Sequence, residues 1–108
     1  MLNKAALKDI PVKNTLPGFY GRFVHGDKST MAFWEINAGA ESPLHEHPHE
    51  QITYIAEGAF EMTIGDEKVV MHQHDALVIP SNVRHGGRAL TDCKIIDTFS
   101  PARDDYKS

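Results

Sequence analysis

The sequence predicts an all-β fold, a sandwich or barrel that occupies a single domain. Short runs of β-branched and aromatic residues recur along its 108 residues, and clusters of Gly, Pro, Asn and Asp separate these runs. No helical periodicity is found after about residue 10. Hydrophobic residues make up 41% of the chain and charged residues 24%, the balance of an ordinary globular protein with one core.

Seven strands are expected in order along the chain, at 19–23, 30–36, 52–56, 60–64, 68–71, 76–79 and 94–99. Turns are predicted between them at Pro17-Gly18, Gly26-Asp27, Asn37-Ala38-Gly39, Glu57-Gly58, Gly65-Asp66, Pro80-Ser81-Asn82 and Gly86-Gly87. Phe60, Met62 and Ile64 alternate with polar residues, so one face of their strand meets the core. Before the first strand, residues 3–9 are expected to form a short helical turn.

Charge and composition exclude several classes of protein. The formal net charge is −4 and no cluster of Lys or Arg occurs, so no nucleic-acid-binding surface is expected. No apolar run approaches the ~18 residues that a membrane span needs. The N-terminus has no apolar segment typical of a signal peptide, so a cytoplasmic location is expected. Cys93 is the single cysteine, which excludes an internal disulfide and a metal site built from several cysteines.

Histidine is the unusual feature of the composition. Seven are present, and His45, His47 and His49 fall within five residues. His45 and His47 are two positions apart, so on a strand both imidazoles project from one face and can reach one ion. Pro48 interrupts strand pairing, so a turn at residues 48–50 is expected before Gln51 opens the next strand. His49 is expected to lie at this turn, exposed to solvent.

A fourth histidine, His85, is expected on a strand after the turn at residues 80–82. Three imidazoles and a carbonyl oxygen would suit a divalent ion such as zinc, nickel, iron or manganese. The alternative is that these are surface histidines in a polar loop, because His-x-His pairs also occur without a metal.

Two segments of the chain resemble the two signature motifs of the cupin superfamily. Residues 39–58 follow the pattern G-x5-H-x-H-x3/4-E-x6-G, and residues 74–89 follow G-x5-P-x-G-x2-H-x3-N. The resemblance implies a single cupin domain over residues 1–108, a small β-barrel of the double-stranded β-helix or jelly-roll type. It also implies one divalent transition metal, held by His45, His47, Gln51 and His85.

The chain departs from these motifs at four positions. Gln51 stands where a glutamate is usual, His74 and Asn82 stand at glycine positions, and Ala89 stands at the asparagine position. A set of three neutral histidines and an amide leaves the charge of a divalent ion uncompensated, which favours an anionic substrate group as a further ligand. Glu50 would be the ligand in place of Gln51 if the preceding turn were shorter.

The last expected strand contains an aspartate, although aspartate is depleted in strands. Ile95, Asp97 and Phe99 share one face by alternation, so Asp97 would lie inside the barrel if its neighbours do. A buried carboxylate needs a partner or a raised pKa, and either makes it a candidate acid or base. Arg103 follows Pro101 and would offer a bidentate fork to a carboxylate at the barrel mouth. Alternatively, Asp97 and Arg103 would form a structural ion pair.

Residues 97–106 resemble the C-terminal signature of small cupins of the KdgF type, which belong to pectin and alginate degradation. Those proteins convert ring-form 4,5-unsaturated uronates, the products of polysaccharide lyases, to linear 4-deoxy-5-keto-uronates. The resemblance implies this activity, the four metal ligands named above and a site completed by Asp97, Phe99 and Arg103. Small cupins commonly pair through a sheet face, so a homodimer is implied as well.

Two other functions stay open on the sequence alone. One is a metal-dependent cupin dioxygenase that acts on a small organic substrate, because three-histidine sites also support oxygen chemistry. The other is a non-catalytic cupin that binds a small ligand, which the complete set of metal ligands disfavours. Asp97 and Arg103 suit an anionic sugar better than an apolar substrate and therefore favour the uronate interpretation. No role is assigned to Arg22, Arg84 and Arg88.

Overall fold

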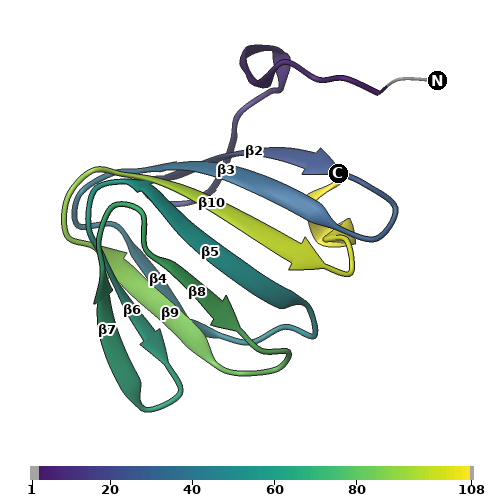
Figure 1. Ribbon diagram of the computed structural model, residues 1–108. Coiled ribbons are helices and arrows are strands. Elements are labelled where there is room, and N and C mark those ends of the chain that lie inside the picture. The colour runs from purple at the N-terminus through teal and green to yellow at the C-terminus, as the bar shows by residue number, and fades with distance from the viewer. Residues whose placement is uncertain (1–2, 108) are drawn as a thin grey trace.

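The computed structural model describes residues 3–107 and shows two antiparallel β-sheets (Figure 1). The elements are, in chain order, the 3-10 helix η1 (Leu7–Asp9), the strands β1 (Lys13–Leu16), β2 (Phe19–His25), β3 (Thr30–Ile36), β4 (Glu41–His45), β5 (Glu50–Glu57), β6 (Phe60–Ile64), β7 (Glu67–Met71), β8 (Ala76–Ile79), β9 (His85–Ala89) and β10 (Cys93–Ser100), and the 3-10 helix η2 (Asp104–Tyr106). Both helices have three residues, so within residues 3–107 no helix is long enough to cross a membrane.

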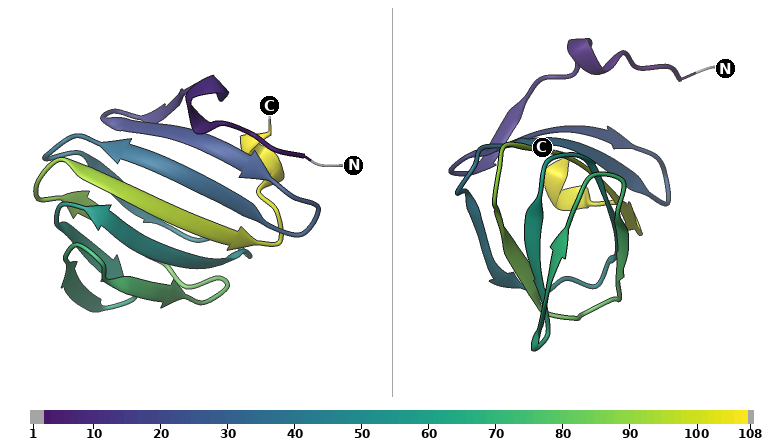
Figure 2. Two further views of the ribbon diagram at one scale, coloured as in Figure 1. Left: turned by 45° about the horizontal axis from the view of Figure 1, so that its top comes forward. Right: turned by 60° about the vertical axis from the view of Figure 1, so that its left-hand side comes forward.

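The two sheets confirm the predicted all-β fold. One has six strands in the order β1-β2-β3-β10-β5-β8, and the other has four in the order β4-β9-β6-β7. They curve around a common interior, as the right-hand view of Figure 2 shows. The arrangement is a jelly roll whose two sheets enclose the core without closing into one continuous hydrogen-bonded barrel.

The last strand, β10, lies in the middle of the six-stranded sheet, between β3 and β5 (Figure 1). Its buried residues are Cys93, Ile95, Asp97 and Phe99, as the alternation predicts. They meet a core to which both sheets contribute, and which includes Phe19, Phe23, Trp34, Ile36, Ile55, Phe60, Met62, Met71 and Ile79. The chain therefore places Asp97 among apolar side chains at the centre of the molecule.

The predicted turn at Gly86-Gly87 is wrong, because both glycines lie inside β9. A Cβ atom at Gly86 would collide with the backbone of Ser42 and Pro43 in β4, and one at Gly87 would collide with Phe60 in β6. These glycines allow β9 to pack closely between its two neighbouring strands, and this close approach rather than a turn explains them.

Other local differences concern the ends of elements. The strands β1, β4 and β9 are absent from the seven predicted ranges, although His85 was expected on a strand. The expected helical turn at residues 3–9 is confined to η1. The bend before β5 covers residues 48–49, so the strand opens at Glu50, one residue earlier than expected. The sequences of β1 and β4 lack a clear alternation of apolar and polar residues. β1 forms a strand because it pairs with β2, and β4 because it pairs with β9.

The glycine positions of the two motifs have a common backbone conformation. Gly39 and Gly58 adopt φ angles of 84° and 91°, and His74 and Asn82, which replace the glycines of the second motif, adopt 73° and 62°. This left-handed region favours glycine and is tolerated by Asn and His better than by bulky residues. At the two glycine positions of the second motif, His74 and Asn82 therefore keep the left-handed backbone conformation that glycine would adopt.

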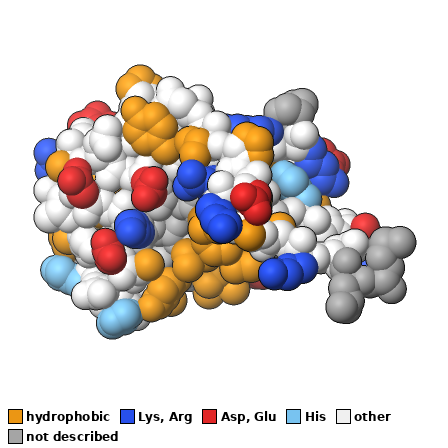
Figure 3. Space-filling view, turned by 90° about the horizontal axis from the view of Figure 1, so that it is seen from above, with side chains coloured by type: hydrophobic (Ala, Val, Ile, Leu, Met, Phe, Trp, Pro, Cys, Tyr) orange, Lys and Arg blue, Asp and Glu red, His pale blue; other side chains and the backbone are white. Residues whose placement is uncertain are grey.

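The outer face of the six-stranded sheet carries an apolar row. One row of paired residues runs across five of its strands and comprises Val24, Met31, Thr98, Ile52 and Val78. The side chains of Met31, Ile52 and Val78 in this row are 39%, 42% and 54% exposed. Figure 3 shows hydrophobic side chains gathered on the surface of the molecule, with charged side chains beside them. The N-terminal segment contacts this face at Arg22, whose Nε donates to the carbonyl oxygen of Ile10.

Candidate metal centre and cavity

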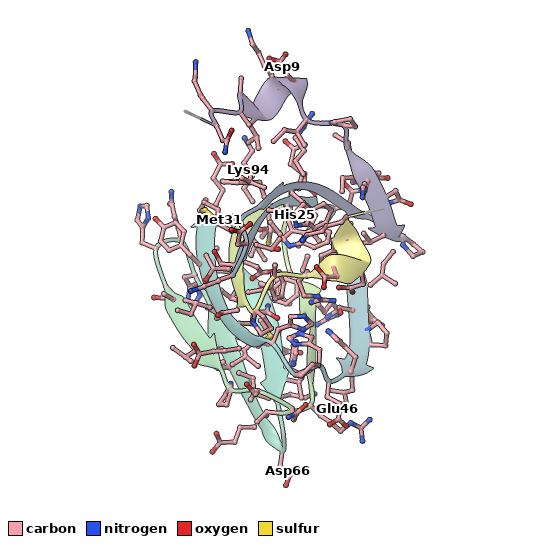
Figure 4. All side chains as sticks on the ribbon, turned by 90° about the vertical axis from the view of Figure 1, so that its right-hand side faces the viewer. Asp9, His25, Met31, Glu46, Asp66 and Lys94 are labelled. Atoms are coloured by element: carbon pink, nitrogen blue, oxygen red, sulfur yellow. The ribbon has the colours of Figure 1, made fainter. Side chains whose placement is uncertain are left out.

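A cavity of about 390 Å³ lies between the inner faces of the two sheets. Figure 4 shows side-chain nitrogen atoms gathered in the interior, near the C-terminal helix η2. Six of the seven residues predicted for the site line this cavity, namely His45, Gln51, His85, Asp97, Phe99 and Arg103. The seventh, His47, packs beside them, because its ring centroid is 4.8 Å from that of His85 and 5.8 Å from that of Phe99.

Three histidines from two regions of the chain converge in this cavity. His45 ends β4 and His47 follows it, whereas His85 opens β9, the strand that pairs with β4. One ring nitrogen from each can be chosen so that all three lie within 4.8 Å of one another. The register places His45 directly opposite His85, so the pairing of two strands brings these two ligands together.

Backbone carbonyl groups fix the tautomer of each of these histidines. The Nδ1 atoms of His45, His47 and His85 lie 2.9, 3.0 and 2.9 Å from the carbonyl oxygens of Pro43, His49 and Val83. A carbonyl oxygen can only accept, so each Nδ1 carries the proton and donates it. A neutral imidazole has one N–H, so each Nε2 is left with a lone pair, the form in which histidine binds metals.

The free lone pairs point to a cation site. The Nε2 atom of His85 is buried and has no hydrogen-bond partner among residues 3–107. The Nε2 atom of His47 lies 3.1 Å from the Gln51 Oε1, which is itself an acceptor. Two acceptor atoms at this distance repel unless a cation or a proton lies between or beside them. The donor set of three imidazoles and one amide oxygen therefore fits a divalent transition metal.

Burial keeps the imidazoles of His47 and His85 neutral. Desolvation is the largest cause that lowers the pKa of His47 to about 4, and the positive charge of Arg103 lowers it further. Desolvation lowers the pKa of His85 as well. At neutral pH both rings are therefore unprotonated, so no proton competes with a metal for their Nε2 atoms.

The pKa of His47 predicts a pH dependence of stability in the metal-free protein. The folded state disfavours protonation of His47, so its contribution is fully present above pH 6.5 and is lost as the pH falls toward 4. The wild type should therefore lose stability relative to His47→Gln across this window. Chemical unfolding of chelator-treated protein at several pH values measures the difference. A gap between the two proteins that does not change with pH would contradict the prediction.

Of the two candidates for a fourth ligand, Gln51 lies in the cavity and Glu50 does not. Gln51 is 7% exposed and lines the cavity, whereas Glu50 is exposed and belongs to the opposite face of β5. His49 is half-buried rather than exposed as expected, and its ring centroid lies 5.4 Å from that of His47. The backbone oxygen of His49 accepts the Nδ1 proton of His47, so this residue supports a candidate ligand.

Asp97 is a buried carboxylate held by two neutral donors. The Trp34 Nε1 donates to its Oδ2 at 3.0 Å, and the Thr53 hydroxyl donates to its Oδ1 at 2.7 Å. Burial raises the pKa of Asp97 to about 6. Hydrogen bonding to Thr53, Gln51 and Trp34 and the positive charge of Arg103 oppose that rise. A carboxyl group with this pKa can take up and release a proton near neutral pH.

Arg103 does not form an ion pair with Asp97, and that alternative is wrong. Its Nε and Nη2 atoms donate to the two carboxylate oxygens of Asp105 at 2.9 and 2.7 Å. Its guanidinium carbon lies 4.7 Å from the ring centroid of Phe99 and 4.2 Å from that of Tyr106. The fork is thus bidentate, as expected, but it holds a carboxylate two residues along the chain.

Four residues of the site were not identified from the sequence: Trp34, Thr53, Asp105 and Tyr106. Thr53 lies two residues after Gln51 on the same strand, so alternation places both on one face. This was the one feature of the sequence that could have identified it. Trp34 contacts Asp97 only through the tertiary fold, whereas Asp105 and Tyr106 contact Arg103 locally, two and three residues along the chain. Of the arginines left without a role, Arg22 donates through Nε to the carbonyl oxygen of Ile10 at 3.1 Å and lies outside the cavity lining.

Comparison with known proteins identifies relatives of this chain. Residues 32–99 match the model of the cupin domain family. The chain is 41% identical over 82 residues to the pectin degradation protein KdgF of Dickeya dadantii, which covers 74% of each protein. Two solved structures resemble it over nearly their whole length. KdgF from Halomonas sp. has a TM-score of 0.90 at 31% identity and covers 97% of this chain and 98% of its own. An RmlC-like cupin from Shewanella frigidimarina has a TM-score of 0.91 at 26% identity and covers 98% and 96%.

Proposed function

This chain belongs to the cupin domain family, and from that membership and its relatedness to KdgF we propose that it converts ring-form 4,5-unsaturated uronates to linear 4-deoxy-5-keto-uronates. The observation that carries the proposal is the meeting, around one cavity, of three histidines, a carboxyl group with a pKa of about 6 and a buried arginine. The cytoplasm is the proposed location of this reaction.

The proposed reaction is an isomerisation that needs no co-reactant. The substrate is a cyclic enol ether with a hemiacetal at C1 and a carboxylate on C5. The C1 hydroxyl loses its proton as the bond between C1 and the ring oxygen breaks, which gives an aldehyde at C1 and an enolate at C5. A proton then adds to C4, and the C5 oxygen becomes a ketone. One proton leaves and one is added, so atoms and charge balance.

Asp97 has the position and the pKa to move this proton. It takes the proton of the C1 hydroxyl as a base and delivers a proton to C4 as an acid. Arg103 holds the substrate carboxylate, and Phe99, against which its guanidinium stacks, forms the wall beside the sugar ring. His45, His47, His85 and Gln51 would hold a divalent nickel, zinc, iron or manganese ion. When bound, this ion supplies Lewis-acid stabilisation of the negative charge that develops on oxygen.

The substrate carboxylate would compete with Asp105 for one edge of Arg103, because Asp105 accepts from Nε and Nη2 in the free protein. Asp105 is more than half exposed at its side chain and therefore can leave the fork without burying its charge. This exchange of one carboxylate for another would preserve the charge balance around Arg103 when substrate binds.

The direct test uses monomeric 4,5-unsaturated galacturonate freshly produced with a polysaccharide lyase. The conjugated absorbance of the substrate is followed with the protein, without it, and with protein treated with a chelator. We expect a metal-dependent loss of absorbance that is faster than the spontaneous decay. No acceleration by a metal-loaded sample would overturn the proposal, and oxygen uptake with small organic substrates would then test the dioxygenase alternative.

A second copy of this chain is the proposed partner of the apolar outer face. Next to the row that contains Met31 and Ile52 lies a row of Arg22, Phe33, Ile96, Tyr54 and Ala76. Beyond it, the next row carries both signs of charge, because Glu35 pairs with Lys94 and Lys94 with Glu57. A surface with both signs at its edge is complementary to its own copy under a two-fold rotation. This self-complementarity supports the homodimer expected from the sequence.

A homodimer that forms through this face should dissociate when a charged residue is introduced there. Ile52→Lys places a charge in the middle of the apolar row and should reduce the mass in solution from twice 12.0 kDa to the monomer value. Light scattering coupled to gel filtration measures it. Val69→Lys, at a similarly exposed position on the other sheet, is the matched control and should stay dimeric. A wild type that is monomeric at micromolar concentration would contradict the proposal.

A further inference from the structure

The hydroxyl of Thr53 forms two hydrogen bonds, one to the candidate metal ligand Gln51 and one to Asp97. The Gln51 Nε2 donates to Thr53 Oγ1 at 3.0 Å, and the Thr53 hydroxyl donates to Asp97 Oδ1 at 2.7 Å. Thr53 is 1% exposed, so bulk water does not replace either bond. The proposed reaction assigns no role to Thr53.

Strand pairing fixes the position of this hydroxyl. Gln51 and Thr53 are two residues apart on β5, and both are buried on its inner face. Thr53 lies directly opposite Asp97 in the register of β5 with β10. The hydroxyl is therefore placed between the two functional side chains by the sheet itself and does not depend on a loop.

The direction of both bonds is determined by chemistry. An amide N–H can only donate and an ionised carboxylate can only accept, so the Thr53 oxygen accepts from Gln51 and its proton goes to Asp97. This arrangement also sets the rotation of the Gln51 amide. With Nε2 held by Thr53, the Oε1 atom is the one that lies 3.1 Å from His47 Nε2.

We propose that Thr53 is a positioning residue that directs the amide oxygen of Gln51 toward the histidines and holds the carboxylate of Asp97, both through one hydroxyl. The part of the proposal that concerns Asp97 in turnover rests on the proposed function. The part that concerns Gln51 and the metal does not.

Loss of the hydroxyl should affect both neighbours. Thr53→Val keeps the shape of the side chain but leaves the Nε2 of Gln51 and the Oδ1 of Asp97 without this partner in a buried space. The amide of Gln51 is then free to turn its Nε2 toward the histidines. An amide nitrogen has no lone pair to offer a cation, so that orientation binds a metal less well.

The experiment compares the wild type, Thr53→Val, Thr53→Ser and Thr98→Val in the full-length chain. Thr98 lies beside Asp97 on the same strand but faces outward, so its substitution is the matched control. The dissociation constant of Zn²⁺ is measured by competition with a chromophoric chelator. The kcat and KM for the unsaturated uronate are measured at saturating metal, and circular dichroism verifies folding.

We expect Thr53→Val to weaken Zn²⁺ binding by about 10- to 100-fold and to lower kcat with little change in KM, and Thr53→Ser to restore both. Wild-type Zn²⁺ affinity in a folded Thr53→Val protein would overturn the proposal, as would a Thr53→Ser protein that is equally impaired. If Thr53→Val does not fold, Thr53→Ala replaces it with the same expected results. A wild type that binds Zn²⁺ but does not convert the uronate refutes the proposed function alone, because the Zn²⁺ comparison still decides the role of Thr53.

Discussion

Asp97→Asn is expected to lower the rate of uronate conversion by about 10²- to 10⁴-fold, the usual contribution of a positioned acid or base. Asparagine has the size of aspartate but cannot take up and release the proton. Its amide oxygen can still accept the bond from the Thr53 hydroxyl, so Thr53 keeps its orientation and Gln51 keeps its donor contact. Metal content and metal affinity should therefore stay at the wild-type level while turnover is lost.

Kinetics at saturating metal, together with metal analysis of the purified variant, measure these two properties separately. The matched control is Asp66→Asn, an identical change at an exposed residue of the hairpin between β6 and β7. Retained turnover in Asp97→Asn would remove the carboxylate from the mechanism. A parallel loss of metal would instead identify Asp97 as part of the support of the metal centre.

His85→Leu is expected to abolish metal binding without destabilising the metal-free protein. The Nε2 of His85 is a buried acceptor without a partner, and a buried polar atom of this kind costs free energy in the metal-free protein. Leucine has a similar volume and no such atom. The metal-free variant should therefore be at least as stable as the metal-free wild type, whereas only the wild type should gain stability on metal addition.

The wild type should gain about 2.7 kcal/mol in unfolding free energy when free metal is 100 times its dissociation constant. Urea unfolding with and without Zn²⁺ measures this gain in both proteins. His72→Leu, at an exposed histidine outside the cavity, is the control and should show the wild-type gain. A full metal-induced gain in His85→Leu would show that the ion binds elsewhere.

Features that depend on strand alternation could be predicted from the sequence. The buried position of Asp97 follows from Ile95 and Phe99 on either side of it, because a period of two leaves no other face for it. The convergence of His45 and His85 was expected from the motif resemblance, and the pairing of β4 with β9 produces it. A short stretch of sequence carries the information for Asp97, whereas for His45 and His85 the motif resemblance supplied what the local sequence lacks.

Features that depend on pairing between distant segments could not be predicted. The strand β4 contains Pro43 and reads as a loop by itself, and its contact with Gly86 and Gly87 in β9 makes it a strand. The choice between Glu50 and Gln51 needed the register of β5 against β10. The contact of Arg103 with Asp105 required the path of the chain after Ser100, which the local sequence does not determine.

The central place of β10 in its sheet has a consequence for biosynthesis. Residues Cys93–Ser100 fill the gap between β3 and β5, so the six-stranded sheet stays divided until this late segment has left the ribosome. During synthesis, β3 and β5 expose unpaired edges and apolar inner faces, which is the situation in which β-rich chains aggregate. Asp97 and Phe99 belong to this same segment, so a chain interrupted before it would lack both its closing strand and its candidate catalytic carboxylate. Completion of the fold and acquisition of activity would then coincide.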